Sequence, residues 1–594
     1  MSGSQSPAAR RRARRIHRNN GRHKRRTPSG GSRIAAVIFF LFVLVIFVAG
    51  SIIYIKKYAP TTERLALDDY YTYLHEDEAA LVINDTYIEP EEEAACGKAI
   101  VRDGELYIRR DTLKASIDDG YVFDDEESIL SYATDSDIIR VPYDSTGYTI
   151  NDQASDWEQQ IVLLEYDQVF VSADWARQFS DFSYTLSEDP YHASIFTAGF
   201  THNTAPLRHK SAIRRLGGPK SKIVKIGKRK ETVSIIKNHG KWTQVATEDG
   251  IIGFVKNRQL GTESETTVEA TLPERTYNHK SLDKRVTLAW HMTTSQAANE
   301  GVDKLLAQTS GVDVISPTWF HINDNSGGIN DNSSGEYVKT CHNKDIQVWG
   351  LASDIEDSSV DVTEVLCRTS HRDKLVDNLV NAAISCGMDG FNIDFEHVPA
   401  DVADGYAQFI RELSIRCEKN DLFLSVDNYV PAAYNAYYNR PVQADYADYV
   451  MVMAYDEYYS GQDEAGSVAS IPFVHDGVEN TLKEVPANQT IQGIPFFCRE
   501  WIEDDGSLSS NSMGMNEVSD YLSKTKASVE WDEDLGQNYA EYVKDGKKHM
   551  LWIEDERSLE KKLDVMKEFD LAGAAFWRLG YETEDAWTVI GRYE

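Results

Sequence analysis

The strongest constraint on the fold is a series of eight short apolar segments that alternate with helical patterns between residues 283 and 594. Strands that alternate with helices form parallel sheets, and eight such units in one domain are typical of a closed β/α barrel. A doubly wound open sheet is the alternative, although it seldom needs eight units. Helices are expected at Thr293–Thr309, His371–Cys386 and Ala403–Lys419. The predicted strands are Val286–Met292, Val312–Trp319, Ile346–Leu351, Gly390–Phe395, Leu422–Val426, Tyr449–Tyr455, Ile491–Phe497 and Ala572–Trp577.

The fourth predicted strand carries a polar pattern that indicates chemistry. Residues 389–396 read Asp-Gly-Phe-Asn-Ile-Asp-Phe-Glu. Because alternate side chains of a strand point to opposite faces, Asn392, Asp394 and Glu396 share the face that lines a barrel. The apolar side chains between them face the helices. Glu396 falls at the carboxyl end of the strand, where barrel enzymes build their active sites.

Carboxylates at a strand end also form structural ion pairs, which is the alternative interpretation. Polar groups that face inward at three alternate positions are costly in a core, however, and this strand has no basic residue to neutralise them. Two stacked carboxyls raise the pKa of one of them, so that it keeps a proton near neutral pH. Glycoside cleavage needs such a protonated acid.

Three motifs resemble those of the family 18 glycoside hydrolases. The segment Asp389–Glu396 matches the fourth-strand motif Asp-x-x-Asp-x-Asp-x-Glu, except that Asn392 replaces one Asp. The segment Met453–Asp456 matches the sixth-strand motif Met-x-Tyr-Asp, and Trp577 matches the tryptophan of the last strand. The resemblance covers residues 283–594 and implies a (β/α)8 barrel.

Within that family the sequence is most similar to the peptidoglycan and spore-cortex branch. This branch carries Asn-Ile-Asp-Phe-Glu and a Gly-Ile-Pro-Phe strand, here Gly493–Phe496 followed by Arg499. The Ser-x-Gly-Gly motif of chitinases is replaced by Val348–Leu351, which weakens a chitinase assignment. A chitinase and a non-catalytic glycan-binding protein are the alternatives. Glu396 argues against the second of these, because family members that become lectins usually lose this residue.

The resemblance also implies the roles of individual residues in a substrate-assisted mechanism, in which the substrate's acetamido group is the nucleophile. Glu396 acts as acid and then base, Asp394 orients the acetamido N–H, and Tyr455 holds the acetamido group by its hydroxyl. Asp456 assists at the same sugar. No metal or organic cofactor is implied. Further residues expected to contact substrate are Asn392, Asp389, Met453, Trp577, Asn428 and Arg499.

The N-terminus combines a basic segment with an apolar one. Residues 1–33 contain eleven Lys or Arg and no acid, and residues 34–55 are apolar throughout. At about 1.5 Å per residue this second segment forms a helix of roughly 33 Å, which is long enough to cross a bilayer. A cleaved signal peptide is the alternative, but no small-x-small cleavage site follows. We therefore expect a single-pass anchor in a bacterial cell membrane, with the basic end in the cytoplasm and the rest outside.

Two further domains are expected between the anchor and the barrel. After a linker at 56–80, residues 81–205 contain a weak repeat with an offset of 63 positions, in which Leu106–Asp111 aligns with Val169–Asp174. Each copy predicts a strand, an Asp helix cap, a short helix and another strand. This α+β region resembles the stalk domain similar to the amine oxidase N-terminal module, and we expect it to act as a spacer.

Residues 206–262 change character and become basic, with fourteen Lys or Arg against three acids between residues 208 and 260. The strand at Gly240–Val245, the turn at Asp249–Gly250 and the strand at Ile251–Val255 resemble a bacterial SH3-type barrel. A contact with the cell wall and a simple spacer remain equal alternatives for this domain. A second linker at 263–282 leads to the barrel at 283–594.

The formal net charge of the whole chain is -33, which does not favour nucleic-acid binding. The six cysteines are scattered without metal-ligand spacing. The expected partners are therefore peptidoglycan, or a related N-acetylated polysaccharide, and the lipid bilayer around residues 34–55. Together the patterns predict a membrane-anchored N-acetylglucosaminidase-like enzyme.

Overall fold

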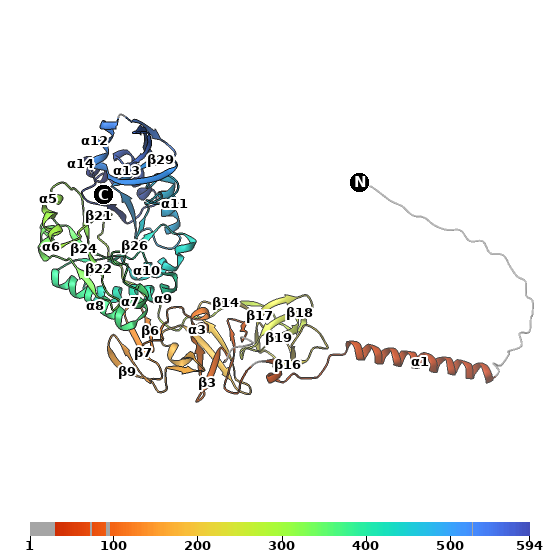
Figure 1. Ribbon diagram of the computed structural model, residues 1–594. Helices are drawn as coiled ribbons and strands as arrows, with labels where there is room; N and C mark the ends of the chain where they lie inside the picture. The colour runs from red at the N-terminus through yellow and green to blue at the C-terminus, as the bar shows by residue number, and fades with distance from the viewer. Residues whose placement is uncertain (1–29, 72–73, 91–95, 526, 594) are drawn as a thin grey trace, which may run out of the picture. The chain divides into compact units, whose positions relative to one another are not determined.

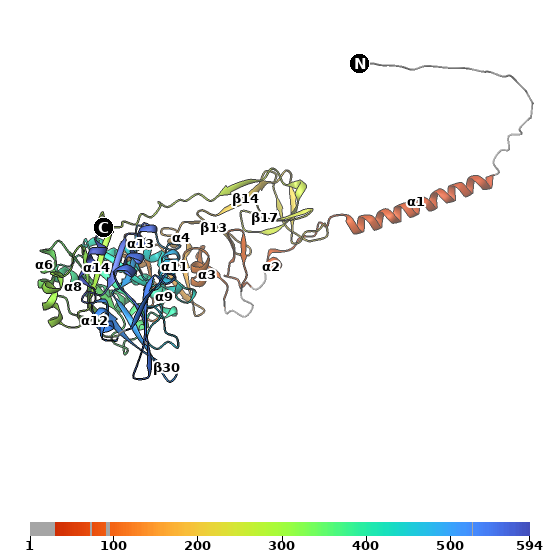
Figure 2. The ribbon, with the colours of Figure 1, turned by 90° about the horizontal axis from the view of Figure 1, so that it is seen from above.

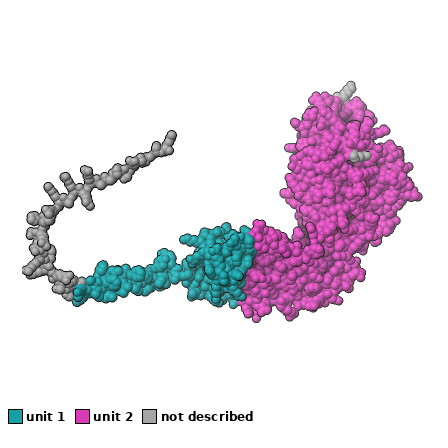
Figure 3. Space-filling view, turned by 180° about the vertical axis from the view of Figure 1, so that it is seen from behind, with its two compact units in different colours: residues 1–70, 203–247, 251–264 teal, residues 71–202, 248–250, 265–594 magenta. Residues whose placement is uncertain are grey.

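The computed structural model describes residues 30–71, 74–90, 96–525 and 527–593, so the predicted basic tail lies outside the described residues as far as residue 29. The chain divides into two compact units (Figure 3). Unit 1 contains the residues up to 70 together with 203–247 and 251–264. Unit 2 contains residues 71–202, 248–250 and 265–594.

Unit 1 begins with helix α1 (Gly30–Tyr58), which is long and apolar enough to cross a membrane by length and composition alone. Its side chains from residue 33 onward are almost all exposed. Lys56 and Lys57 close its last turn. A short helix, α2 (Leu67–Tyr70), follows.

The rest of unit 1 is a small antiparallel β domain. The predicted hairpin is present, because Trp242 to Ala246 of β18 pair with Lys256 to Ile252 of β19. The chain that leaves α1 is fastened to this domain: the Thr61 N–H donates to the Pro219 carbonyl at 2.8 Å, and Arg64 forms a β-bridge with Ile223. Part of the predicted linker at 56–80 therefore belongs to the β domain. Its strands are β15 (Ser211–Arg214), β16 (Ile223–Gly227), β17 (Thr232–His239), β18 (Trp242–Ala246) and β19 (Ile252–Lys256), flanked by β14 (Thr201–Pro206) and β20 (Ser264–Thr267).

The N-terminal part of unit 2 contains the predicted repeat as two strand–strand–helix–strand–strand series. The two copies pair with each other, since Val171 of β11 lies opposite Ile108 of β4. The predicted Asp caps are wrong: Asp111 and Asp174 lie inside the first helical turns, and Ser172 caps α4 by accepting the Trp175 N–H. The first series is β3 (Ala99–Arg102), β4 (Glu105–Arg109), α3 (Arg110–Ser116), β5 (Val122–Asp124) and β6 (Ile129–Ala133). The second is β10 (Val162–Glu165), β11 (Gln168–Ser172), α4 (Ala173–Ala176), β12 (Phe182–Ser187) and β13 (His192–Thr197).

These series build three sheets. Two have four strands, in the orders β12-β13-β1-β2 and β10-β11-β4-β3, and the third is a five-stranded antiparallel meander from β5 to β9. The remaining strands are β1 (Ala80–Ile83), β2 (Thr86–Ile88), β7 (Ile138–Pro142), β8 (Gly147–Ile150) and β9 (Gln153–Asp156).

The C-terminal part of unit 2 is a closed barrel of eight parallel strands inside a ring of helices (Figure 1). All eight strand predictions are confirmed, and the barrel has the architecture of a (β/α)8 domain. The strands are β21 (Val286–His291), β22 (Val314–Ile322), β24 (Gln347–Ser353), β25 (Gly390–Asp394), β26 (Phe423–Tyr429), β27 (Tyr449–Met453), β28 (Thr490–Pro495) and β34 (Gly573–Trp577). A short strand, β23 (Ile329–Asp331), pairs antiparallel with β22.

Two of the three predicted helices match closely, as α8 (Thr369–Cys386) and α9 (Ala403–Lys419). The region predicted as Thr293–Thr309 is instead a 3-10 stretch at Gln296–Gly301 followed by the short helix α5 (Val302–Leu306). The other helices around the barrel are α6 (Gly335–His342), α7 (Val362–Cys367), α10 (Arg440–Tyr446), α11 (Ile471–Thr481), α13 (Glu556–Glu568) and α14 (Glu584–Ile590).

An insertion that the sequence patterns did not predict lies between the last two barrel strands. Its five antiparallel strands have the order β30-β29-β33-β32-β31, and β30 forms one edge (Figure 2). Its core includes Cys498, Met513 and Leu551. The elements are β29 (Phe497–Asp504), β30 (Ser507–Gly514), α12 (Met515–Thr525), β31 (Ser528–Asp532), β32 (Gln537–Lys544) and β33 (Lys547–Ile553).

The two faces of strand β25 divide as predicted. Phe391, Ile393 and Phe395 are buried in the layer between strands and helices, and the Phe395 ring stacks on Phe409 of α9 with centroids 5.3 Å apart. Asn392 and Asp394 face the barrel interior instead. Apolar burial outside the strands therefore holds a polar column inside them.

A buried charge network joins the β5–β9 meander to helices α8 and α9. Glu412 of α9 is almost fully buried and accepts the Arg372 Nε–H at 3.0 Å, while Arg140 of β7 lies 2.7 Å from its other oxygen. Arg140 also contacts Asp373 at 2.8 Å. Since buried charges are tolerated only when paired, these residues fix the meander against the barrel helices.

Replacing Glu412 by Ala would leave Arg372 and Arg140 without their shared carboxylate. We expect the free energy of unfolding to fall by about 3–5 kcal/mol, the usual cost of breaking a buried pair. Urea denaturation followed by tryptophan fluorescence measures this change. Asp377→Ala is the matched control, because Asp377 of α8 is the half-exposed partner of Arg416 of α9 and its loss should cost less than about 1 kcal/mol. Equal costs for the two variants would contradict a stabilising role of the network.

Candidate active site

A cavity opens beside the carboxyl ends of β25, β26 and β27. Its volume is about 720 Å³, and its lining includes Glu396, Tyr429, Met453, Tyr455 and Asp456. Four of the predicted site residues therefore meet at one opening, although they come from different strands. The parallel register explains this, since all eight strands end at the same edge of the barrel.

Glu396 lies two residues beyond the end of β25 and is half-buried. The Tyr429 hydroxyl donates a hydrogen bond to Glu396 Oε2. The Glu396 backbone N–H donates to Asp354 Oδ1 at 2.8 Å, and the His397 N–H donates to the second oxygen of Asp354 at 3.0 Å. The catalytic-acid candidate thus has a fixed backbone and a side chain that reaches the cavity.

Asp394 lies behind Glu396 on the same face of the strand and is buried. Burial raises its pKa well above the ordinary range, and the nearby carboxyls of Asp427 and Glu396 raise it further. The Asp394 carboxyl therefore holds its proton more tightly than an exposed carboxyl does. Asn392, two residues before Asp394 in β25, is completely buried and accepts a hydrogen bond from the Trp290 Nε1–H at 2.7 Å.

Aromatic side chains surround the polar column. Trp290 is buried, with its ring centroid 5.9 Å from that of Trp577 and 6.5 Å from that of Tyr455. Trp577 is only partly buried at the end of β34, so one part of its surface is available to a sugar ring. Burial raises the pKa of Tyr455 well above its usual value, and Asp394 adds to the effect, so its hydroxyl keeps its proton and can donate.

Asp456 and Arg499 meet at the cavity. The Arg499 guanidinium lies 3.7 Å from Asp456 Oδ1 and also donates to Ser510 at 3.4 Å. Arg499 comes from β29, the first strand of the insertion, so the insertion contributes directly to the site. Asp456 has a left-handed backbone with φ of 57°, a conformation that Asp tolerates better than most residues.

Two predicted substrate contacts lie away from the cavity. Asp389 precedes β25, at the opposite end of the strand from Glu396, and its Oδ2 accepts the Val348 N–H and a hydrogen bond with His342, both at 2.8 Å. Asn428 occupies a position of β26 whose side chain points toward the helices, and its Nδ2 donates to Gln443 Oε1 of α10 at 2.6 Å. Both side chains therefore serve the framework of the barrel.

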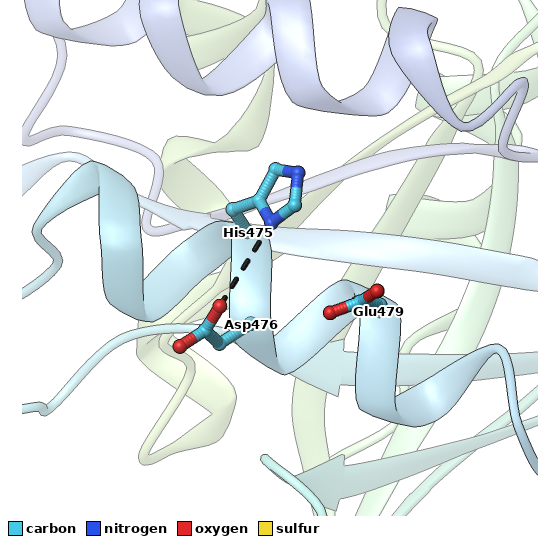
Figure 4. Close-up of side chains that lie close together, drawn as sticks. All are labelled: His475, Asp476 and Glu479. Atoms are coloured by element: carbon cyan, nitrogen blue, oxygen red, sulfur yellow. Dashed lines mark ion pairs between the residues drawn. The ribbon is translucent and has the colours of Figure 1, made fainter.

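One group of possible metal ligands lies outside the cavity. His475, Asp476 and Glu479 project from α11 with ligand atoms within 4.8 Å of one another (Figure 4). Asp476 and Glu479 are exposed, and His475 already lies 3.8 Å from Glu568. Exposed acids on a helix commonly form such groups without a metal, so this group is not assigned to the site.

Sequence patterns missed two residues that contact Glu396, namely Tyr429 and Asp354. Each lies at or just beyond the end of a neighbouring barrel strand, β26 or β24. Once the barrel is predicted, the polar residues that follow its strands can be expected to gather at one rim. The position of Tyr429 and Asp354 at the ends of predicted strands was therefore the signal that could have identified them.

Comparison with known proteins identifies the domain that holds this site. Residues 290–582 match the family model described as "Glycosyl hydrolases family 18". The chain contains a family 18 glycosyl hydrolase domain. The matched residues include the cavity and Trp577, and the domain makes the protein a glycoside hydrolase.

Relatives of the family 18 domain include two proteins of Bacillus subtilis (strain 168). "Uncharacterized glycosylase YvbX" is 28% identical over 281 residues, which cover 45% of this chain and 80% of the relative. "Cortical fragment-lytic enzyme" is 26% identical over 227 residues, which cover 36% of this chain and about half, 52%, of the relative. Among solved structures, a chitinase from Chromobacterium violaceum ATCC 12472 matches with a TM-score of 0.47 and 21% identity, over 52% of this chain and 98% of the other.

Replacing Tyr429 by Phe keeps the ring and removes the hydroxyl that contacts Glu396. A hydrogen bond to a charged group contributes about 1.5–3 kcal/mol, so we expect kcat to fall by roughly tenfold or more with a smaller change in KM. Hydrolysis of the glycan that the wild type cleaves measures this effect. Tyr593→Phe is the control, because it removes a hydroxyl–carboxylate contact at Asp564 far along the chain from the site. Unchanged kcat in Tyr429→Phe would contradict a role for the contact.

Asp354 predicts a pH dependence of stability. Burial raises its pKa to about 6, above the roughly 3.9 of an unfolded chain, so the folded protein binds this proton more tightly. The associated stability is fully present below about pH 4 and is lost as pH rises through about 6. Asp354→Asn should remove this dependence, which amounts to on the order of 2 kcal/mol. Urea denaturation at pH 4.5 and pH 7 tests it; equal pH slopes for variant and wild type would refute it.

Proposed function

We propose that this protein cleaves N-acetylglucosamine linkages in peptidoglycan by substrate-assisted, retaining catalysis, while anchored to the cell membrane. The observation that carries the mechanism is the position of Asp394. It is the buried last residue of β25, two positions before Glu396, and only Glu396 of the two lines the cavity. This placement does not favour two carboxyls that flank a glycosidic bond from opposite sides. The nucleophile is then supplied by the substrate, as its own 2-acetamido oxygen.

The residues around the cavity support each step of that reaction. Glu396 protonates the glycosidic oxygen while the acetamido oxygen attacks the anomeric carbon. Asp394 accepts the acetamido N–H and stabilises the positive charge of the ring that forms, and the Tyr455 hydroxyl donates to the acetamido oxygen. Glu396 then accepts a proton from the incoming water. Asp456, held by Arg499, contacts the same sugar.

The choice of peptidoglycan rests on the relatives and on the motifs of the site. A cortical fragment-lytic enzyme and a glycosylase are among the proteins that the barrel resembles. The Asn392–Glu396 and Gly493–Phe496 segments have the form found in the peptidoglycan and spore-cortex branch. Chitin contains the same sugar and is the competing substrate, which the products of digestion distinguish.

The proposed anchor is supported by α1 and the residues beside it. An apolar helix with exposed side chains, preceded by a basic segment and closed by Lys56 and Lys57, is suited to a single membrane span. The SH3-like β domain is fastened to the chain three residues beyond the helix, at Thr61, which suits a position close to the membrane surface. The repeat region resembling the amine oxidase N-terminal module serves as a spacer in this arrangement.

Glu396→Gln tests the proposal with the full chain in detergent. Purified peptidoglycan and chitin are digested separately, and mass spectrometry identifies the sugar at the reducing end of each fragment. We expect wild type to release peptidoglycan fragments that end in N-acetylglucosamine, and Glu396→Gln to reduce their release by a factor of at least about 100. Glu464→Gln, an exposed acid in the loop after β27, is the matched control.

Each other result has a definite meaning. Fragments from chitin alone would replace the proposed substrate by chitin. Reducing-end N-acetylmuramic acid would place the cut at the other linkage. Binding to peptidoglycan without any fragments would leave a wall-binding protein in place of the enzyme proposed here.

A further inference from the structure

Asn392 places an amide in the barrel interior, at a position where the fourth-strand motif of family 18 has an Asp carboxyl. Asn392 is completely buried, and all four of its hydrogen-bonding positions are used. Its Oδ1 accepts from Trp290 at 2.7 Å and from Ser316 at 3.1 Å, and its Nδ2 donates to Asp427 at 2.7 Å and to Ser425 at 3.2 Å. Because the Trp290 N–H can only donate, the amide oxygen must face Trp290 and the NH2 group must face Asp427.

An amide in this orientation cannot take up or release a proton during the reaction. If Asp394 is to change its charge, another group must exchange the proton. The candidates are the titratable groups that surround it from neighbouring elements: Glu396 on its own strand, Asp427 of β26, Asp354 and Glu356 after β24, and Tyr455 and Asp456 after β27.

Strand register singles out Asp427 among these groups. Asn392 pairs with Ser425 across β25 and β26, and the next inward positions on the two strands are Asp394 and Asp427. Neighbouring strands lie about 4.8 Å apart, so the two carboxyls occupy adjacent places in one layer of the interior. Both are buried, and in the described part of the chain neither Asp394 Oδ1 nor Asp427 Oδ2 has a hydrogen-bond partner.

The charged groups that act most strongly on the pair are acids. Asp427, Glu396, Asp354 and Glu356 act on Asp394, and Glu396 also acts on Asp427. Two adjacent carboxyls in such a site cannot both ionise, and they titrate as a pair. In agreement, burial raises the pKa of Asp427 to about 8, and the pKa of Asp394 is raised as well.

We propose that Asp427 is the positioning residue that exchanges a single proton with Asp394, and so replaces the carboxyl that Asn392 lacks. As substrate binds, the O–H bond on Asp394 Oδ1 breaks and an O–H bond forms on Asp427 Oδ2. Asp394 becomes the carboxylate that receives the acetamido N–H, and Asp427 becomes neutral. The pair keeps one proton and one negative charge throughout. The catalytic part of this step rests on the proposed function, whereas the shared proton does not.

An exchange of the two side chains tests the proposal through activity. Asp427→Asn alone should lower kcat by roughly tenfold to a hundredfold with little change in KM, because Asp394 loses its proton partner. Asn392→Asp alone adds a third carboxyl beside Asp427 and should also lower kcat. The double variant returns one carboxyl to the neighbourhood of Asp394 and should recover most of the lost activity. If the kcat of the double variant is no higher than the value expected from multiplying the two single-variant effects, the proposal is overturned.

Infrared spectroscopy tests the shared proton without any substrate, so its outcome does not depend on the proposed function. The full chain should show the C=O stretch of a protonated carboxyl that persists above neutral pH. Asp427→Asn and Asp394→Asn should each make this band disappear at a lower pH, because the like-charge neighbour is gone. Asp448→Asn, a buried carboxyl at the opposite end of β26 and β27, is the control and should leave the band in place near pH 8. If the band disappears at the same pH in wild type, Asp427→Asn and Asp394→Asn, the shared proton is refuted.

Discussion

The interior of the barrel contains buried polar side chains that form no salt bridge among the described residues. Asn392, Asp394 and Asp427 lie inside a closed ring of strands, where water is excluded and where the side chains above and below are largely aromatic or aliphatic. Such a column is stable only while its members remain neutral or share hydrogen bonds. The same burial that makes this column costly in a core raises the pKa of both Asp394 and Asp427.

Packing outside the strands makes this possible. Phe391, Ile393 and Phe395 bury their side chains against the helices, and the alternation of the strand then forces the polar residues inward. The rim of the barrel is organised differently. There Glu396 is held through its backbone by Asp354 and through its carboxyl by Tyr429, so residues from the two strands beside β25 fix the acid. The insertion after β28 adds Arg499 to this rim through Asp456.

Sequence patterns predicted most of the barrel because strand and helix periodicities are local properties. All eight strands and helices α8 and α9 were found in this way. The group of Glu396, Asp394, Tyr455 and Asp456 was instead expected from the family motifs, and three of its members, Glu396, Tyr455 and Asp456, line one cavity. The insertion at 497–553 was missed, since its strands begin directly where a predicted barrel strand ends. Its one sequence signal was the unusually long interval between the last two barrel strands. Asp389 and Asn428 were expected to contact substrate, but Asp389 lies at the other end of its strand and Asn428 binds Gln443 of α10. Strand parity separates Asp427, which faces inward, from Asn428, which faces the helices.

The network of Arg140, Glu412 and Arg372 has a consequence for how this protein can evolve and be divided. Glu412 and Arg372 belong to the barrel, yet part of their neutralisation comes from the preceding meander, which also covers them from water. A barrel separated from residues 71–202 would lose Arg140 and would expose the charges of Glu412 and Arg372, which are buried in this structure. The catalytic domain is therefore not a freely interchangeable module. Its sequence has become dependent on one particular neighbour, so that recombination with another spacer would first require new residues at positions 372 and 412.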